Sequence, residues 1–481
     1  MVSLLIALAA LVGGYFLYGA LIEKVFGADA KRKTPAYTMH DGVDYLPMPS
    51  WKVFLIQFLN IAGLGPIFGA IMGVMFGPAA FLWIVLGTIF GGAVHDYLSG
   101  MLSLRRGGVS LPEIVGQELG TGVKQTMRVF SLLLMILVGA VFVINPADLL
   151  AGMTPDWMDR TVWIGLIFAY YILATLLPID KLIGNLYPVF GAALLFMACG
   201  LLGYMLFSGI ELPFGFSEGM ANRSPNPEAT PIFPMMFVSI ACGAISGFHA
   251  TQSPMMARCL KNEKMGRPIF YGAMVAEGIV ALIWAAAAIA FTGGYGGLDN
   301  YMAENGNLPA KLVNDVSVSW LGTVGGVLAI LGVVAAPITS GDTALRSARL
   351  IAADFMGIQQ KTIVKRLLVS VPIFAAAFGI MLIDFNVLWR YFGWCNQALS
   401  VFTLWTVTVY LSRKGGLAYV MTLIPAMFMT AVCVCYALFA PSMGLALDYN
   451  LSVILSVAAA LLLAGLFFAK RPKPALSLGE S

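Results

Sequence analysis

The stretch NIAGLGPIFGA, residues 60–70, decides the fold of this chain. It lies near the middle of an apolar run, residues 51–77, that is long enough to cross a bilayer. Gly63, Gly65 and Pro66 weaken or remove helical hydrogen bonds at a depth where lipid offers no replacement. Such a break survives only where it is buried in protein or lines a cavity. We therefore expect an interrupted membrane helix with a functional site beside the interruption.

The composition places the whole chain in a membrane. Of its 481 residues, 59% are hydrophobic and 11% are charged, whereas a soluble domain is about 25% charged. Because a membrane-spanning helix needs about 20 apolar residues, the sequence predicts an all-α protein with thirteen spans. The expected spans are residues 3–22, 52–76, 79–104, 126–144, 162–177, 182–207, 234–257, 268–291, 320–342, 367–383, 393–411, 419–439 and 452–469.

The positive charges divide between the two sides of these spans. Of the 28 lysines and arginines, all but Arg160, Arg223, Lys311 and Arg390 fall on one side when the thirteen spans alternate in direction. The side rich in Lys and Arg is the cytoplasmic one by the positive-inside rule. We therefore predict an N-terminus outside the cell and a C-terminus in the cytoplasm.

A second interrupted span follows five spans after the first. The run FVSIACGAISGFHATQSPMM, residues 237–256, carries Gly243, Gly247 and Pro254 among several polar residues. Each interruption alone is also compatible with a kink or a close-packing device. Two of them at corresponding positions of two halves are typical of a transporter binding site. Because the two spans start on opposite sides, the sequence predicts an inverted repeat of five plus five helices.

The expected organisation follows from this repeat. Residues 51–207 form the first five-helix repeat and residues 234–411 the second, joined by an outer loop at 208–233. The additions are an N-terminal helix with a basic cytoplasmic loop at 1–50, two C-terminal helices at 412–469, and a cytoplasmic tail at 470–481.

Ionisable residues at membrane depth are functional candidates. His95 and Asp96 lie in the third span, and Glu277 lies at a similar depth in the eighth, which is its partner in the repeat. The two acids could relay a proton or pair with a substrate amine. A purely structural pairing with His95, His249 or the backbone is the alternative.

The ninth span ends in a dense group of oxygen-bearing residues, ITSGDTALRSARL, residues 338–350. Hard cations such as Na⁺ want several oxygen ligands, so a Na⁺ site at Thr339 and Ser340 is one hypothesis. Asp342 alone could instead be a proton site, or it could cap a following cytoplasmic helix. The full set of coupling candidates is His95, Asp96, Glu277, Thr339, Ser340, Asp342 and Thr343. The substrate-binding candidates are Asn60, Gly63, Gly65, Gly247, His249, Gln252 and Glu277.

The sequence lacks the motifs of several other activities. The sequence has no GxxxxGK[ST] loop and no HExxH, so neither ATP hydrolysis nor zinc proteolysis is indicated. It has three histidines and six cysteines, and no two cysteines form a CxxC pair. We expect no enzyme activity, no cofactor, no metal centre apart from the Na⁺ hypothesis, and no nucleic-acid partner.

Four stretches of the chain resemble the carbon starvation protein A family. They are NIAGLGPIFGAIMG (60–73), GAVHDYLSGMLSLRRGG (92–108), SGFHATQSPMMARC (246–259) and ITSGDTALRSARL (338–350). The resemblance implies a bacterial inner-membrane transporter that is expressed on nutrient limitation and takes up peptides or pyruvate, with proton coupling. It also implies the LeuT-like five-plus-five fold of the amino acid–polyamine–organocation superfamily. Asp96 and Asp342 lie inside the matching motifs.

These observations predict a secondary active importer, driven by protons, for short peptides or other small carbon sources. Helix N-termini at the two breaks would face a substrate carboxylate, and an acid would balance an amine, which favours a peptide. A pyruvate/H⁺ symporter or a Na⁺-coupled carboxylate symporter is the alternative, and a non-transporting nutrient sensor is an alternative of another class. The expected partners are the substrate and the lipid bilayer, and the oligomeric state stays open.

Overall fold

The computed structural model describes residues 1–42, 44–152, 154–176, 183–210, 212, 220–360, 362–441 and 443–471. These residues form helices and no strand, as the sequence predicts. Part of the expected outer loop (residues 211 and 213–219) and most of the expected tail (residues 472–481) lie outside the described residues.

Eight helical segments of the described chain are long and apolar enough to cross a membrane, and two bent helix pairs raise this number to ten. Ala79–Arg105 is one of these segments, and it contains α5 (Ala79–Leu86), η2 (Gly87–Gly92) and α6 (Ala93–Arg105). Six others lie in or around α1 (Val2–Phe26), α8 (Thr121–Ala151), α10 (Ile183–Phe207), α14 (Gly272–Thr292), α18 (Ile363–Ile380) and α20 (Val420–Phe439). The eighth is α21 (Tyr449–Lys470). The chain is therefore a multi-pass membrane protein.

The helix that contains the opening stretch is interrupted as predicted. The helix α3 (Ser50–Ile61) ends one residue after Asn60, and a π-helical turn, η1 (Gly65–Gly69), continues into α4 (Ala70–Val74). The two parts are bent by 54°. The proline at the first turn of η1 lacks the N–H that would bond back to α3, so the helix cannot continue straight.

The second interruption lies where the glycines predicted it. The described chain forms η4 (Ile232–Met236), α11 (Phe237–Ser239) and α12 (Ala241–Ala244), and then α13 (Gly247–Ala257). Between α12 and α13, Ile245 (φ −159°, ψ 136°) and Ser246 (φ −144°, ψ 123°) are extended. Two residues of extended backbone at the centre of an apolar run separate the two half-helices.

The ninth span differs from the expectation. The span expected at 320–342 is divided between α16 (Pro309–Ala329) and α17 (Ala335–Met356), which are joined by η7 (Ile330–Val334) and bent by 56°. Asp342 therefore lies inside α17, and its interpretation as a helix N-cap is wrong. Hydropathy is continuous across the bend, so the apolar pattern could not locate the boundary between the two helices.

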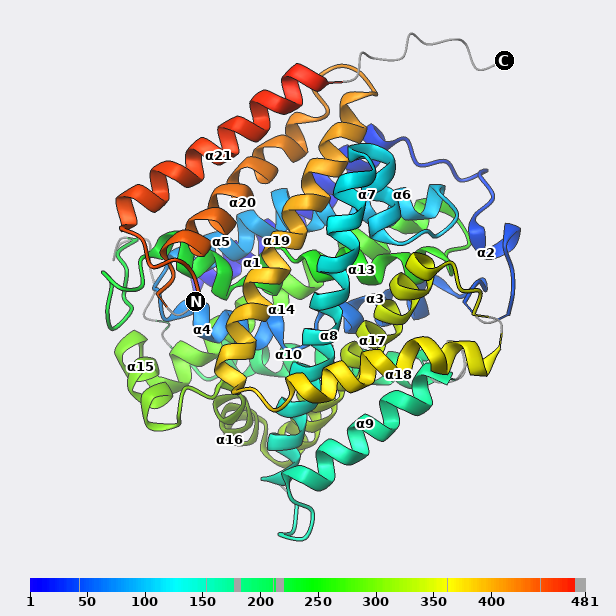
Figure 1. Cartoon of the computed structure of the whole chain (residues 1–481). Helices are drawn as coiled ribbons and strands as arrows, with labels where there is room; N and C mark the ends of the chain where they lie inside the picture. The colour runs from blue at the N-terminus through cyan, green and yellow to red at the C-terminus, as the bar shows by residue number, and fades with distance from the viewer. Residues whose placement is uncertain are drawn as a thin grey trace, which may run out of the picture.

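The longest helices form the frame that holds these breaks. Figure 1 shows α8 and α19 (Phe385–Ser412) crossing the molecule, with α20 and α21 along one edge and α9 (Arg160–Leu176) along another. The helix α8 packs against both α17 and α19. Inside the frame, α3 packs against α10, α13, α14 and α17. The first interrupted helix is therefore central, between the elements that carry the candidate residues.

A stripe of glycines joins the two interrupted helices. A Cβ atom on Gly65 would lie 2.1 Å from the Cβ of Cys242, and one on Gly73 would lie 2.1 Å from the Cγ1 of Ile240. Between them, a Cβ on Gly69 would lie 2.9 Å from a backbone oxygen of α11. Real Cβ atoms essentially never come this close to a neighbour. The absent side chains therefore let η1 and α4 pack directly on α11 and α12.

Candidate functional site

Four buried ionisable side chains form a continuous row. The Nδ1 atom of His95 lies 2.7 Å from Oδ1 of Asp96, and the Nδ1 atom of His249 lies 2.8 Å from Oδ2 of the same carboxylate. On its other side, the Nε2 atom of His249 lies 3.4 Å from Oε2 of Glu277. All four side chains are fully buried. We call these four residues the carboxylate–histidine row.

The hydrogen-bond pattern assigns protons within the row. The Asp96 carboxylate accepts from both Nδ1 atoms when each imidazole carries its proton there. A neutral His249 then has Nε2 free to accept a proton, and Glu277 lies on that side. The 3.4 Å separation is long for a hydrogen bond, so a small approach would be needed for transfer. An imidazole nitrogen and a carboxyl oxygen thus face each other across this gap.

The breaks in the helices explain why these residues meet. His249 is the third residue of α13, directly after the extended pair that separates α12 from α13. The helix α6, with His95 and Asp96, packs against α13. Both α6 and α14 follow a π-helical turn, η2 or η6 (Arg267–Tyr271), and such turns are frequent at functional sites. The sequence allowed two interpretations of the buried acids, a proton relay and a structural pairing with histidine. Both interpretations concern the same atoms of this row.

Asn60 and a second polar residue of the same helix are both buried at the centre of the molecule. Asn60 and Gln57 lie three residues apart on α3, and both are fully buried. None of their side-chain amide atoms has a hydrogen-bond partner in the described part of the chain. The Oε1 atom of Gln252 on α13 is in the same state. Buried amides without partners are costly, so these groups are available to a polar ligand or to water.

Gln57 was not among the predicted site residues. Its sequence pattern contains the clue, because a glutamine three residues before Asn60 in an apolar run lies on the same face of a helix. Of the predicted glycines, Gly63 packs tightly, since its Cβ would lie 2.9 Å from a ring carbon of Phe142.

The N-terminus of α13 is occupied by a side chain. The Oδ1 atom of Asn396 on α19 accepts a 2.7 Å hydrogen bond from the Phe248 N–H and a 3.0 Å bond from the Ser246 hydroxyl. A Cβ on Gly247 would lie 2.4 Å from the Ser400 backbone nitrogen, so this helix start packs directly on α19. In this conformation an amide of α19 takes the place that a substrate carboxylate was expected to fill.

The oxygen-rich group of α17 forms a separate cluster. The Tyr187 hydroxyl on α10 lies 2.7 Å from Oδ2 of Asp342 and 3.1 Å from the Thr339 carbonyl oxygen. The Ser340 hydroxyl donates a 3.1 Å hydrogen bond to the Leu59 carbonyl oxygen. The Thr343 hydroxyl donates to the Ser340 carbonyl at 3.0 Å. The helix α3 packs against both α17, which carries this cluster, and α13, which carries His249 of the carboxylate–histidine row.

One of the two carboxylate oxygens of Asp342 is not used in a hydrogen bond within the described chain. Its side chain is fully buried, and its Oδ1 atom has no hydrogen-bond partner in the part of the chain that is described. The hydroxyls of Thr339 and Ser340 donate to backbone carbonyls at 2.8 and 3.1 Å. The Na⁺ site at Thr339 and Ser340 stays a prediction.

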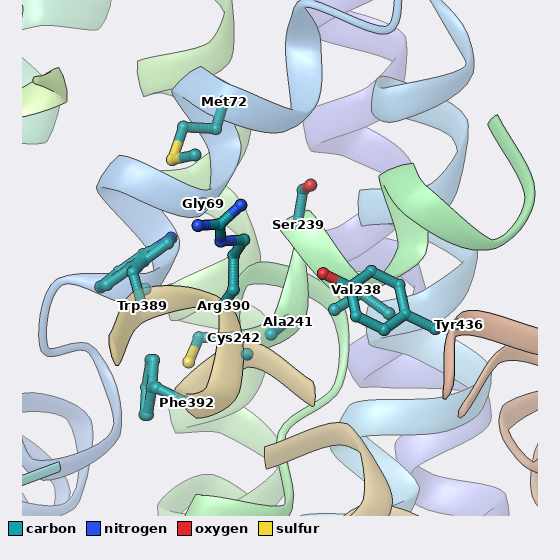
Figure 2. A pocket seen from close by; sticks show the side chains of 12 residues that line it. Gly69, Met72, Val238, Ser239, Ala241, Cys242, Trp389, Arg390, Phe392 and Tyr436 are labelled. Carbon is teal, nitrogen blue, oxygen red and sulfur yellow. The ribbon is translucent and has the colours of Figure 1, made fainter. Parts of the chain in front are cut away.

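A small cavity of about 60 Å³ lies beside the two breaks. Gly65 and Gly69 of η1 line one wall, Cys242 of α12 lines another, and Trp389 and Arg390 of α19 line a third. Figure 2 shows the Arg390 side chain extending along the cavity toward Gly69. The sequence analysis placed Arg390 only among the four cations of the sparse side. Its position next to the breaks depends on how α19 packs, which sequence spacing does not give.

The described residues hold no group of three or more His, Cys, Asp and Glu side chains arranged to bind a metal ion. The carboxylate–histidine row is linear rather than convergent, since each group faces the next one. Such a row suits proton transfer between neighbours better than the coordination of one ion.

The sequence profile of the family described as "Carbon starvation protein CstA" matches residues 1–157, 151–320 and 308–436. The chain therefore belongs to the carbon starvation protein CstA family, as the motifs indicated. A Haemophilus influenzae membrane protein is 48% identical over 58% of this chain and 88% of its own length. The peptide transporter CstA of Bacillus subtilis is 27% identical over 86% of each chain.

The pyruvate/proton symporter BtsT of Escherichia coli is 30% identical to the chain over 57% of its length and covers 46% of BtsT itself. Among solved structures, a manganese transporter of Eremococcus coleocola matches with a TM-score of 0.55 at 12% identity, over 90% of this chain and 98% of that one. This likeness shows a shared fold. The fold and the relatives together define a membrane transporter.

Proposed function

We propose that the chain is a proton-coupled secondary active importer of small carboxylated nutrients, either short peptides or pyruvate. The observation that carries this proposal is the carboxylate–histidine row, with Asp96 bonded to two histidines and Glu277 next in line. Ionisable rows buried at membrane depth are typical of proton pathways. His249, an inner member of the row, is the third residue of the helix that follows the second break, so a proton on His249 can influence the substrate region.

The proposed arrangement in the membrane is the one that the charge distribution predicts. Thirteen spans contain an inverted repeat of five plus five helices, with the N-terminus outside and the C-terminus in the cytoplasm of a bacterial inner membrane. Support comes from the two interrupted helices in the structure, which are five spans apart in the predicted arrangement, and from the solved transporter structure of the same fold. The superfamily that the resemblance implies has this repeat. In this arrangement the cavity near Arg390 lies toward the outer side of the membrane.

The substrate would lie between the breaks, against α3 and α13. Asn60, Gln57 and Gln252 have unpartnered amide atoms there, and amides can bind the carboxylate and carbonyl groups of a peptide or a keto acid. Gly63, Gly65 and Gly247 allow the backbone to come close to neighbouring groups. Because Asn396 caps α13 in this conformation, we expect the substrate to displace or rearrange that contact when it binds.

Two alternatives stay open within the transporter class. A peptide amine could pair with Glu277 or Asp96, whereas pyruvate needs only an anion site, and relatives of both kinds exist. Na⁺ coupling at Thr339 and Ser340 would replace proton coupling if the hydroxyls and nearby carbonyls bind the ion. We favour protons because the row consists of groups that can each bind a proton, and its members lie 2.7 and 2.8 Å apart, too close to hold a metal cation between them.

Uptake into proteoliposomes tests the proposal. Labelled pyruvate and a labelled dipeptide are each offered under an inward H⁺ gradient and, separately, under an inward Na⁺ gradient. We expect accumulation of one substrate under the H⁺ gradient and its loss when a protonophore is added. Accumulation only under the Na⁺ gradient would show that Na⁺, and not H⁺, is the coupling ion. Failure of both substrates under both gradients, with the protein shown to be folded and inserted, would favour the nutrient-sensor alternative.

A further inference from the structure

We propose that the cavity beside the two breaks is a carboxylate-binding site on the substrate path, and that Arg390 is the residue that recognises the carboxylate. This inference rests on the proposed function and gives it a specificity-determining residue. It concerns a position that neither the motifs nor the breaks pointed to.

The first argument is the position of the cavity. Its wall contains Gly65, which begins η1 after the first break, and Cys242, which lies in α12 just before the second. Figure 2 shows the Arg390 side chain extending from α19 between the ribbons that carry Gly69 and Ser239. A group bound to Arg390 would therefore sit at the ends of both interrupted helices, on the outer side of the proposed substrate region.

The second argument is the chemistry of the cavity wall. Of the twelve lining residues, Arg390 is charged and none is acidic; most of the others, including Trp389, Met72 and Phe392, are apolar. A guanidinium among apolar groups interacts more strongly with an anion than it would in water. Its planar donors match a carboxylate in a bidentate geometry. The wall has no acidic group to balance the charge of an amine, so it favours the carboxylate over the cationic end of a peptide.

The third argument is size. The cavity of about 60 Å³ is well below the roughly 300–1,000 Å³ of typical ligand pockets. It accommodates a carboxylate group and its immediate neighbours, which pyruvate and the C-terminus of a peptide have in common. A whole peptide would extend inward from it, toward the unpartnered amides of α3 and α13.

Two other cations of the sparse side lie away from the cavity. The Nε atom of Arg160 lies 2.6 Å from Oδ1 of Asp148 in an exposed ion pair. The Nζ atom of Lys311, in the first turn of α16, contacts the Asn305 side chain. Neither residue lines the cavity. Arg390 is one of the four cations on the sparse side, and it lies beside the breaks. A cation in this position can both attract an anion and bind it.

The test compares Arg390→Gln, Arg390→Lys and the matched control Arg160→Gln in proteoliposomes. We expect Arg390→Gln to raise KM for the carboxylate substrate about 10- to 100-fold, the loss typical of hydrogen bonds to a charged group, with a smaller change in kcat. Arg390→Lys keeps the positive charge but lacks the planar bidentate donors of the guanidinium. Its KM should therefore lie between those of the parent and of Arg390→Gln. Arg160→Gln should leave KM unchanged. A KM for Arg390→Gln equal to that of the parent overturns the inference while leaving the transporter proposal intact.

A binding measurement separates this inference from the transport assay. Trp389 also lines the cavity, so pyruvate or a dipeptide bound there should change its fluorescence, and Trp389→Phe identifies its share of the total emission. We expect saturable quenching in the parent protein and a right-shifted titration in Arg390→Gln, even in detergent without any gradient. If transport fails but this titration succeeds, the carboxylate site stands and the coupling proposal does not. If neither substrate quenches Trp389, the site is rejected.

Discussion

The Nδ1 atom of His249 lies 2.8 Å from Oδ2 of Asp96, although 153 positions separate the two residues in the chain. The contact joins α13, immediately after the second break, to α6. It is fully buried, where a bond to an ionised group is stronger and an unpaired partner more costly than at the surface. A change in the protonation of His249 must therefore alter the helix that begins at the break.

Replacing Glu277 by Gln should uncouple transport from the proton gradient. The substitution keeps the size of the side chain but removes the group that can exchange a proton with His249 Nε2, 3.4 Å away. We expect gradient-driven accumulation to fall to background, while exchange of labelled for unlabelled substrate across the vesicle membrane continues. Proton-driven accumulation at the parent rate in Glu277→Gln would remove this residue from the coupling step.

Replacing Asp342 by Asn should abolish gradient-driven uptake and leave some substrate binding. The side chain is fully buried, accepts from Tyr187 and has one oxygen without a partner in the described chain. Tyr187→Phe is the companion variant, and loss of its hydroxyl should lower the free energy of unfolding by about 1–3 kcal/mol. Binding and thermal unfolding are measured on both. Normal accumulation by Asp342→Asn contradicts a coupling role.

Gly65→Ala should disrupt the contact between η1 and α12. The new Cβ would lie 2.1 Å from the Cβ of Cys242, and overpacking of this kind costs about 1–3 kcal/mol. We expect a lower unfolding temperature and slower transport. The double variant Gly65→Ala with Cys242→Gly removes the clash and should recover much of the loss. An unchanged Gly65→Ala protein would show that the two half-helices can separate freely.

Asn396→Ala should weaken the start of α13. It removes the acceptor for the Phe248 N–H and the Ser246 hydroxyl, and the loss of such a cap costs about 1 kcal/mol. Gln397→Ala is the matched control, because the neighbouring Gln397 amide donates only a 3.3 Å hydrogen bond to the Phe237 carbonyl. Thermal unfolding of both variants in one detergent compares the costs. Equal costs would argue against a special role for Asn396.

Asp299 provides a pH prediction outside the membrane spans. It lies in α15 (Tyr295–Glu304), and burial raises the pKa of its carboxyl from 3.8 to about 6. The folded protein therefore holds this proton more tightly than the unfolded chain does. Its contribution favours folding below pH 4 and is lost as the pH rises to about 6. Asp299→Asn should unfold at a higher temperature than the parent at pH 7.5, and the difference should shrink at pH 4. A pH-independent difference contradicts this account.

Sequence reasoning located the breaks because glycine and proline act locally. The breaks after Asn60 and at residues 245–246 lie where the glycines predicted them, whereas Pro254, which was also expected to break its span, lies inside the continuous helix α13. The acids were found for a similar reason, since Asp96 and Glu277 stand out in apolar runs. The bend between α16 and α17 was not located although Gly332 lies in η7 and Pro337 follows it, because hydropathy stays high through residues 329–334 and the span was placed by its hydropathy.

Long-range partners could not be predicted, because spacing along the chain does not give the packing between helices. Tyr187 binds Asp342 across 155 positions, and Asn396 caps a helix that begins about 150 positions earlier. Arg390 was noticed only as one cation among four. Gln57 could have been found, because it is one helical turn before Asn60 on the same face.

Because Gly65 packs closely on Cys242, the accessibility of this cysteine reports the conformation of the protein. Cys242 is 3% exposed and lines the cavity near Arg390, so a thiol reagent that cannot cross a bilayer reaches it only when η1 and α12 move apart. Cys199 is the exposed cysteine, and its replacement by Ser removes the background. The rate of alkylation at Cys242 then reports the fraction of molecules open to that side, with no dye or spin probe attached.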